Sequence, residues 1–132
     1  MKIARKFWFS MGHTLHNYQG KCANFHGHNY CLIITVCSDT LNTQDMVMDF
    51  GDLDHIVSSI INRDYDHRFL ICDKDRRAEG LKLLDPTVSI VPFNPTAEML
   101  AYTIKQQIIA LTLNVKIGSL TLWETENSYA KV

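Results

Sequence analysis

Residues 21–36 have the sequence KCANFHGHNYCLIITV, in which two histidines separated by a glycine precede an apolar run. The apolar run predicts a β-strand, and side chains two positions apart on a strand lie on the same face of a sheet. His26 and His28 can therefore bind one metal ion without distorting the backbone. Gly27 between them adds no bulk, so this stretch predicts a metal-binding strand at the end of a sheet.

A third histidine stands upstream of this pair. His13 follows the strand-like residues 6–10, KFWFS, and three histidines are a common catalytic zinc set that leaves a fourth position for water or substrate. Cys22 has no CxxC partner, so its thiol suits a general base better than a structural ligand. A His-x-His pair alone occurs more often without a metal than with one. The metal hypothesis therefore depends on the added histidine and cysteine.

The composition is typical of a globular protein with a packed core. The chain has 132 residues, of which 46% are hydrophobic and 20% charged, so we expect a single domain over residues 1–132. The net charge of −1 provides no basic excess for a nucleic acid, and no such partner is expected. No CxxC pair and no signal peptide are recognised, so we expect free thiols and a cytoplasmic location. No apolar run approaches 20 residues, so we expect no membrane association.

The first half of the chain predicts two strands followed by a helix. Residues 2–10 alternate in hydrophobicity and residues 28–38 are mostly apolar, with a polar loop between them. Residues 53–61 then place apolar side chains at i, i+3, i+4, i+7 and i+8, which is typical of an amphipathic helix. Asp52 is the expected N-cap of this helix, with Asp49 as the second choice.

A second helix is predicted by both its start signals and its apolar stripe. Asn94 is the expected N-cap and Pro95 the first helical residue, while Glu98 lies in the first turn, where the helix dipole favours an anion. Capping alone explains this segment. The apolar stripe comprises Ala97, Leu100, Ala101, Ile104, Ile108 and Leu111.

The order of the elements predicts an α+β fold. Residues 76–80 are interpreted as an exposed excursion between the helices, residues 88–91 as a short strand, and residues 115–124 as an alternating closing strand. Together these elements predict a small antiparallel sheet with two helices packed on one face. Such a sheet leaves open edges that stable proteins cover or pair, so we expect assembly with neighbouring subunits.

Two acidic positions are further candidates for a site. Asp66 precedes His67, and a carboxylate can orient an imidazole, although adjacent residues seldom pair directly in a strand and a solvated turn is the simpler interpretation. Glu124 would point into the same layer as the apolar residues two and four positions before it. A carboxylate on an apolar face costs free energy unless it is paired, so Glu124 is a candidate ligand anchor.

Taken together, these residues resemble the 6-pyruvoyltetrahydropterin synthase family, which includes the bacterial 6-carboxytetrahydropterin synthases of the queuosine pathway. No single segment is diagnostic, but their order and spacing are highly specific. The resemblance covers nearly the whole chain and is carried by Phe9 to His13, Cys22 to His28, Met48-Asp49-Phe50, Asp66-His67, Asn94 to Glu98 and Trp123-Glu124-Thr125.

The resemblance implies a role for each matched side chain. The implied ligands of a Zn²⁺ cofactor are His13, His26 and His28. The implied catalytic residues are Cys22, Asp66 and His67. The implied substrate-binding residues are Glu124, which would grip the pterin, and Thr96 and Glu98, which match the segment lining that pocket. A carboxylate suits a pterin because the 2-amino group and ring N–H form a two-donor edge that it accepts bidentately.

The implied activity is that of a zinc-dependent lyase acting on 7,8-dihydroneopterin triphosphate and expelling triphosphate. The short spacer between Cys22 and His26 resembles the branch that forms 6-carboxy-5,6,7,8-tetrahydropterin and acetaldehyde. Residues 68–93 are long compared with compact bacterial members, so the pyruvoyl-forming synthase remains an alternative, as does a non-catalytic pterin- or zinc-binding module. The implied fold closes a β-barrel in each trimer, with two trimers stacked into a homohexamer and the active site between subunits.

Overall fold

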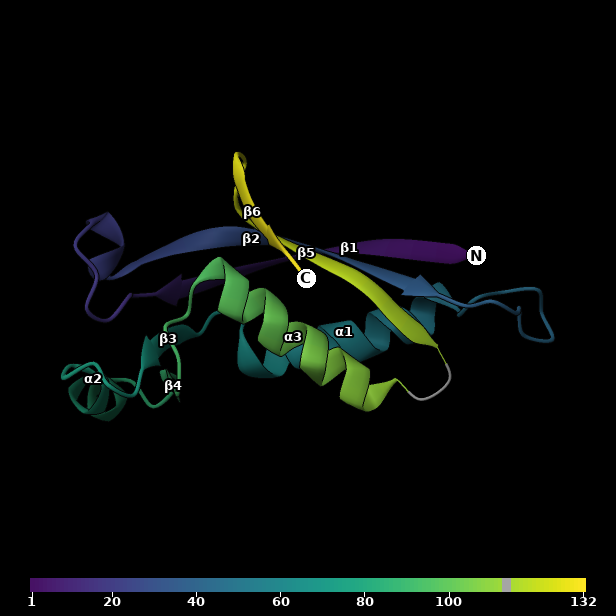
Figure 1. Ribbon diagram of the computed structural model, residues 1–132. Helices are drawn as coiled ribbons and strands as arrows, with labels where there is room; N and C mark the ends of the chain where they lie inside the picture. The colour runs from purple at the N-terminus through teal and green to yellow at the C-terminus, as the bar shows by residue number, and fades with distance from the viewer. Residues whose placement is uncertain (113–114) are drawn as a thin grey trace.

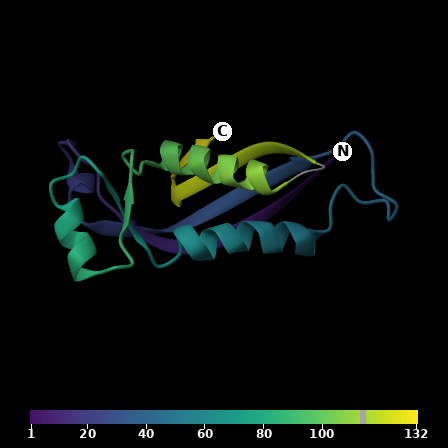
Figure 2. The same cartoon turned by 90° about the horizontal axis from the view of Figure 1, so that it is seen from below.

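The computed structural model describes residues 1–112 and 115–132 and has the expected α+β fold (Figure 1). Two long helices, α1 (Phe50–Asp64) and α3 (Ala97–Leu111), cover one face of a single curved sheet. Seen from below, both helices run along the strands that they cover (Figure 2). Within the described residues, no helix is both long enough and apolar enough to cross a membrane.

The sheet is mixed, with an antiparallel centre and a parallel edge. Among the described residues its strand order is β4-β3-β1-β2-β5-β6. The strands are β1 (Lys2–His13), β2 (His26–Cys37), β3 (Phe69–Cys72), β4 (Ser89–Val91), β5 (Lys116–Thr125) and β6 (Ser128–Lys131). β3 pairs in parallel with both β1 and β4, whereas the other neighbours pair antiparallel. A helix precedes β3 and another precedes β4, and crossovers of this kind allow parallel pairing.

A third helix occupies the segment that the sequence predicted to be an exposed excursion. Helix α2 (Ala78–Leu84) lies at the same end of the molecule as the short 3-10 turn η1 (Lys21–Ala23) (Figure 1). The prediction of exposure is wrong for Ala78, which is buried against Ile71 and Val88 in a small second core. The predicted strand over residues 88–91 is confirmed as β4.

The expected N-cap of α1 is wrong by three residues. Asp49 caps the helix, and its carboxylate accepts a hydrogen bond of 2.6 Å from the backbone N–H of Gly51. Because the backbone turns helical directly after Asp49, Asp52 already lies in the first turn. There its charge still interacts favourably with the helix dipole.

The expected N-cap of α3 is also wrong, and the reason bears on the site. Thr96 caps the helix by accepting from the N–H of Met99 at 3.4 Å. Asn94 instead forms two hydrogen bonds with the backbone of His16, accepting from its N–H at 2.7 Å and donating to its C=O at 3.0 Å. The start of α3 is therefore tied to the segment that follows β1.

The core lies between the sheet and its two long helices. Its fully buried side chains include Leu32, Ile34, Leu53, Ile60, Leu100, Ile104, Leu120 and Leu122. Each such side chain stabilises the fold by about 1.5–3 kcal/mol relative to exposure, so we expect the core to remain folded without a bound metal. Leu111 of the predicted stripe is half exposed because α3 ends there. On the opposite face of the sheet, Trp8 is 68% exposed.

Candidate metal and active site

The pairing of β1 with β2 gathers three histidines at one end of the sheet. His13 stands directly opposite His26, and His28 lies two residues further along β2 on the same face. Gly27 is required between the last two, because a Cβ there would approach the carbonyl oxygen of Met11 to 2.9 Å. The predicted convergence of the three imidazoles is therefore built into the strand register.

Each of the three imidazoles directs one nitrogen into a shared space. One ligand atom from each ring lies within 4.8 Å of the other two, and the Nε2 atoms of His13, His26 and His28 are buried without a hydrogen-bond partner. A buried polar nitrogen without a partner costs free energy. Three such atoms facing one another satisfy the donor requirement of a transition metal ion, so these residues fit Zn²⁺.

Backbone carbonyl groups orient two of the rings. The Nδ1 of His13 lies 2.7 Å from the carbonyl oxygen of Pro95, and the Nδ1 of His26 lies 2.9 Å from that of Asn24. Each Nδ1–H donates to its carbonyl, which leaves the lone pair on Nε2 free for a metal. Sequence reasoning missed both carbonyl groups, because a backbone acceptor has no residue-type signal.

Burial favours the metal-binding form of His13 and His28. Burial lowers the pKa of His13, and the neighbouring His26 lowers it further against the opposing effect of the Pro95 carbonyl. Burial also lowers the pKa of His28, although Glu124 opposes this change. Neutral imidazole is the metal-ligating form, so these rings are available at neutral pH.

Glu124 lies beside the histidine group, on the face that its spacing predicted. Its Oε1 is 3.6 Å from the Nε2 of His13 and 3.9 Å from that of His28, and it accepts a hydrogen bond of 3.4 Å from the hydroxyl of Tyr30. Burial raises the pKa of Tyr30 and the carboxylate raises it further, so the phenol remains a donor. This hydrogen bond fixes the carboxylate at the edge of the site.

Cys22 approaches the same site from the turn η1. Its thiol is free and half-buried, and the backbone carbonyl of Cys22 accepts a hydrogen bond of 2.9 Å from the N–H of Leu15, two residues after His13. The metal-ligating group found among the described residues consists of three histidines and does not include Cys22. The cysteine is therefore placed beside the histidines rather than among them.

The side chains of Asp66 and His67 pair directly. The sequence alone had made a solvated turn the simpler interpretation. The Nδ1 of His67 lies 2.8 Å from Oδ2 of Asp66, and His67 adopts a left-handed backbone with φ of 56°. The other oxygen of Asp66 accepts from the N–H of Ser10 at 3.0 Å. Although burial opposes the change, the hydrogen bonds from Ser10 and His67 lower the pKa of Asp66. Residues 65–67 form a turn, as the sequence predicted, and within it the Asp66 carboxylate is hydrogen-bonded while the His67 ring is exposed to solvent.

His67 is not part of the group formed by the three metal-site histidines. The His67 side chain is 83% exposed and borders a hollow of about 310 Å³ that Ser10, Asn29 and His28 also line. The side chains of Ser10 and Asn29 are hydrogen-bonded to each other and alternate with those of the metal-site histidines, so they point to the opposite face of the sheet.

The two remaining predicted site residues lie at the start of α3. Thr96 is its N-cap, and Glu98 is exposed in its first turn. Thr96 directly follows Pro95, whose carbonyl group orients His13, and Glu98 lies two residues further on. No hydrogen bond or ion pair of the Glu98 side chain is found within residues 1–112 and 115–132.

By fold and by site, the protein is an α+β protein whose sheet ends in a histidine group suited to a transition metal. Residues 2–132 match the sequence model of the family described as 6-pyruvoyl tetrahydropterin synthase. The chain is 35% identical to 6-carboxy-5,6,7,8-tetrahydropterin synthase of Haemophilus influenzae, over 98% of this chain and 96% of that protein. It is 37% identical to the synthase of the same name from Aquifex aeolicus, over 84% and 75%. The chain belongs to the 6-pyruvoyl tetrahydropterin synthase family.

Solved structures share the fold over the whole chain. An uncharacterised protein of Wolinella succinogenes has a TM-score of 0.80 at 24% identity, covering 100% of this chain and 97% of that one. The 6-pyruvoyl tetrahydropterin synthase of Caenorhabditis elegans has a TM-score of 0.76 at 23% identity, covering 100% and 94%. At these identities the similarity establishes the fold.

Proposed function

We propose that this protein is a zinc-dependent lyase that converts 7,8-dihydroneopterin triphosphate to 6-carboxy-5,6,7,8-tetrahydropterin, with release of triphosphate and acetaldehyde. Atom balance requires the uptake of a water molecule. The observation that carries the proposal is the set of three buried Nε2 atoms without partners beside the Glu124 carboxylate. Full-length relatives with the name of this synthase support the choice of reaction.

In this proposal His13, His26 and His28 hold the zinc ion. When bound, zinc supplies Lewis-acid chemistry that acidifies protons on the substrate side chain. Glu124 accepts the two N–H donors of the pterin edge, which orients the ring. The half-buried thiol of Cys22 serves as a base on the side chain once it is ionised.

Asp66 and His67 supply the second proton-transfer group. Asp66 accepts from Nδ1 of His67, so the Nε2 of His67 is the atom that exchanges protons with substrate. Because the His67 side chain is 83% exposed and is not part of the histidine group, we propose that it acts in the site of a neighbouring subunit. We therefore propose a homohexamer of two trimers, with each active site between subunits.

The remaining parts of the proposal concern the chain as a whole. Residues 1–132 act as one pterin-synthase-like domain, and the product enters the queuosine pathway. The partner is a small pterin triphosphate, with no nucleic acid or membrane partner, and the protein works in the cytoplasm. The net charge of −1 supports the absence of a nucleic acid partner.

A product assay tests the reaction. Zinc-loaded protein is incubated with 7,8-dihydroneopterin triphosphate, and acetaldehyde, triphosphate and the pterin product are quantified by mass spectrometry. We expect equal amounts of acetaldehyde, triphosphate and 6-carboxy-5,6,7,8-tetrahydropterin. Triphosphate without acetaldehyde would identify the pyruvoyl-forming reaction instead. Pterin binding without release of triphosphate would identify a non-catalytic pterin-binding module.

A further inference from the structure

We propose that Arg77 is a positioning residue for the active site: held by Asp75, its guanidinium fixes the Cys22 turn and the adjoining ends of the two histidine-bearing strands. We call this group the Arg77 brace, and it consists of Arg77, Asp75, Thr14, Ala23 and Phe25. The inference deepens the proposed function and rests on it where turnover is concerned.

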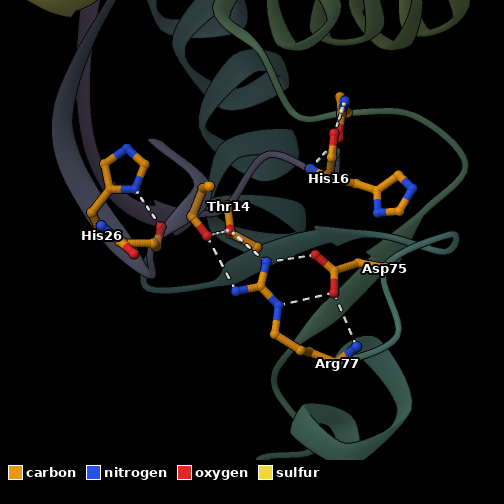
Figure 3. Close-up of polar contacts among 8 residues, drawn as sticks. Thr14, His16, His26, Asp75 and Arg77 are labelled. Carbon is orange, nitrogen blue, oxygen red and sulfur yellow. Dashed lines mark hydrogen bonds and ion pairs between the residues drawn. The ribbon is translucent and has the colours of Figure 1, made fainter. Parts of the chain in front are cut away.

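Asp75 orients the guanidinium through a two-point contact. The Nε of Arg77 donates to Oδ1 of Asp75 at 2.9 Å, and NH2 donates to Oδ2 at 2.6 Å (Figure 3). The carboxylate also accepts from the backbone N–H of Arg77 at 3.0 Å. Asp75 is only 5% exposed, and a bidentate Arg–carboxylate pair has a fixed planar geometry. The remaining N–H groups of the guanidinium therefore point in a defined direction.

The remaining N–H groups of Arg77 contact residues beside the site. Arg77 belongs to residues 68–93, a segment to which no other role is assigned. NH1 of Arg77 donates to the carbonyl oxygen of Ala23 at 3.1 Å, and NH2 donates to Oγ1 of Thr14 at 3.1 Å (Figure 3). The guanidinium carbon also lies 4.7 Å from the centre of the Phe25 ring, within the range of a cation–π contact. Thr14 in turn donates to the Ala23 carbonyl at 2.9 Å.

Each residue that Arg77 contacts outside its own segment is the chain neighbour of a site residue. Thr14 follows His13. Ala23 follows Cys22. Phe25 precedes His26. A single planar side chain thus joins the ends of β1 and β2 to the turn η1 between them.

This arrangement compensates for the weak local structure around Cys22. The turn η1 is three residues long, and a 3-10 turn of that length has little stability of its own. Its backbone hydrogen bonds include Ala23 N–H to Gly20 C=O at 3.0 Å and Leu15 N–H to Cys22 C=O at 2.9 Å. A catalytic group must be held closely to its working position, and a displacement of about 1 Å can cost on the order of a hundredfold in rate.

Hydrogen exchange in three variants tests the brace directly. Arg77→Met removes both the guanidinium and its charge. Arg77→Lys keeps the charge but cannot form the planar two-point contact with Asp75. Arg76→Met is the matched control, because Arg76 is exposed and makes no ion pair or hydrogen bond within the described chain. Exchange is followed in peptides covering residues 14–25 and, as a reference, residues 30–36 of β2. Zinc content and steady-state kinetics are measured on the same samples.

We expect both Arg77 variants to raise exchange in residues 14–25 by about tenfold or more, with no change in residues 30–36, since local opening is distinct from global unfolding. In both, kcat should fall at least about tenfold while KM stays within about twofold, and zinc should remain bound. Arg76→Met should match the wild type in every measurement. If Arg77→Met does not fold, Arg77→Lys gives the decisive comparison.

Two results would overturn the brace. One is unchanged exchange in residues 14–25 of Arg77→Lys. The other is an equal rise in both peptides with unchanged kcat, which would mean that Arg77 only stabilises the fold. A wild-type protein that does not turn over the pterin triphosphate would overturn the proposed function, and the exchange data would still decide whether Arg77 fixes the Cys22 turn.

Discussion

The three metal-site histidines and His67 have the same side chain in opposite environments. His13 is 1% exposed, and its ring is oriented by a backbone carbonyl from a different element, the Pro95 segment before α3. The side chain of His67 is 83% exposed and is held by the carboxylate of the residue beside it. The first environment fixes both the tautomer and the direction of the ring before any ligand arrives. The second fixes the tautomer and leaves the ring open to solvent.

In the proposed divided site, one subunit contains a finished half of a site and presents another half at its surface. Rings whose Nε2 atoms converge, two of them oriented by backbone carbonyl groups, are ready to bind a metal without rearrangement. An exposed imidazole outside this group becomes part of a closed site only when another surface covers it. Substitutions in each half should therefore have separable effects.

The largest effect should come from removing a metal ligand. We expect His28→Ala to abolish zinc binding and turnover while most of the fold remains, because the core between the sheet and helices stands without the metal. His67→Ala should lose turnover but keep about one zinc per chain. Zinc is measured by elemental analysis and the fold by circular dichroism, with exposed His55→Ala as the control. Full zinc occupancy in His28→Ala would refute the ligand assignment.

The next largest effect should separate the thiol from the carboxylate. Cys22→Ala should abolish turnover and leave pterin binding intact, because the ring contacts and zinc remain. Glu124→Ala should weaken binding, since a hydrogen bond to a charged group contributes about 1.5–3 kcal/mol, or about tenfold to more than a hundredfold in affinity. Calorimetric titration with biopterin or sepiapterin measures both. Lost binding in Cys22→Ala with retained binding in Glu124→Ala would reverse the roles proposed for these two residues.

The close contact at Gly27 gives a smaller, structural effect. A Cβ at this position would meet the carbonyl oxygen of Met11 at 2.9 Å, so Gly27→Ala should lower the free energy of unfolding by about 1–3 kcal/mol. Gly80→Ala is the control, because a Cβ there meets nothing within 4 Å. Gly80 lies inside α2, where alanine should stabilise by about 0.5–1 kcal/mol. Equal effects of the two changes in chemical denaturation would contradict the proposed crowding of the strands.

The smallest effect should depend on pH. The Arg77 guanidinium lowers the pKa of Asp75 from its ordinary value of 3.8 to about 2. A lowered pKa in the folded state stabilises the protein above the unfolded pKa, and that stabilisation is lost as the pH falls from about 4 to about 2. Asp75→Asn should therefore cost about 2 kcal/mol at pH 7, and the difference from wild type should shrink toward pH 2. Asp39→Asn, at an exposed carboxylate, is the control variant.

The sequence predicted those features that have a strong periodic or residue-type signal. The long helices and the three central strands have clear periodicity, and the convergence of His13, His26 and His28 follows from spacing of two along a strand. The four residues of β3, FLIC, are all apolar and therefore show no alternation that would distinguish a strand. β6 is also four residues long and was not predicted. The parallel edge of the sheet was missed with β3.

What the sequence could not reveal about the site depends on long-range backbone contacts. The carbonyl of Pro95 orients His13 across 82 residues of sequence, and Asn94 ties the same segment to His16 across 78. These contacts also removed Asn94 from the capping role that its residue type predicted. The contacts of Arg77 could not be predicted for the same reason, because its partners Thr14 and Ala23 are distant in the chain.

The most direct test of the divided site is complementation between two inactive variants. Cys22→Ala and His67→Ala are co-expressed with different tags, and oligomers containing both chains are purified through both tags. If each site takes Cys22 from one subunit and His67 from its neighbour, random mixing should restore about one quarter of wild-type turnover. Mixed oligomers no more active than the two parents would contradict the account and would place both groups in the site of a single subunit.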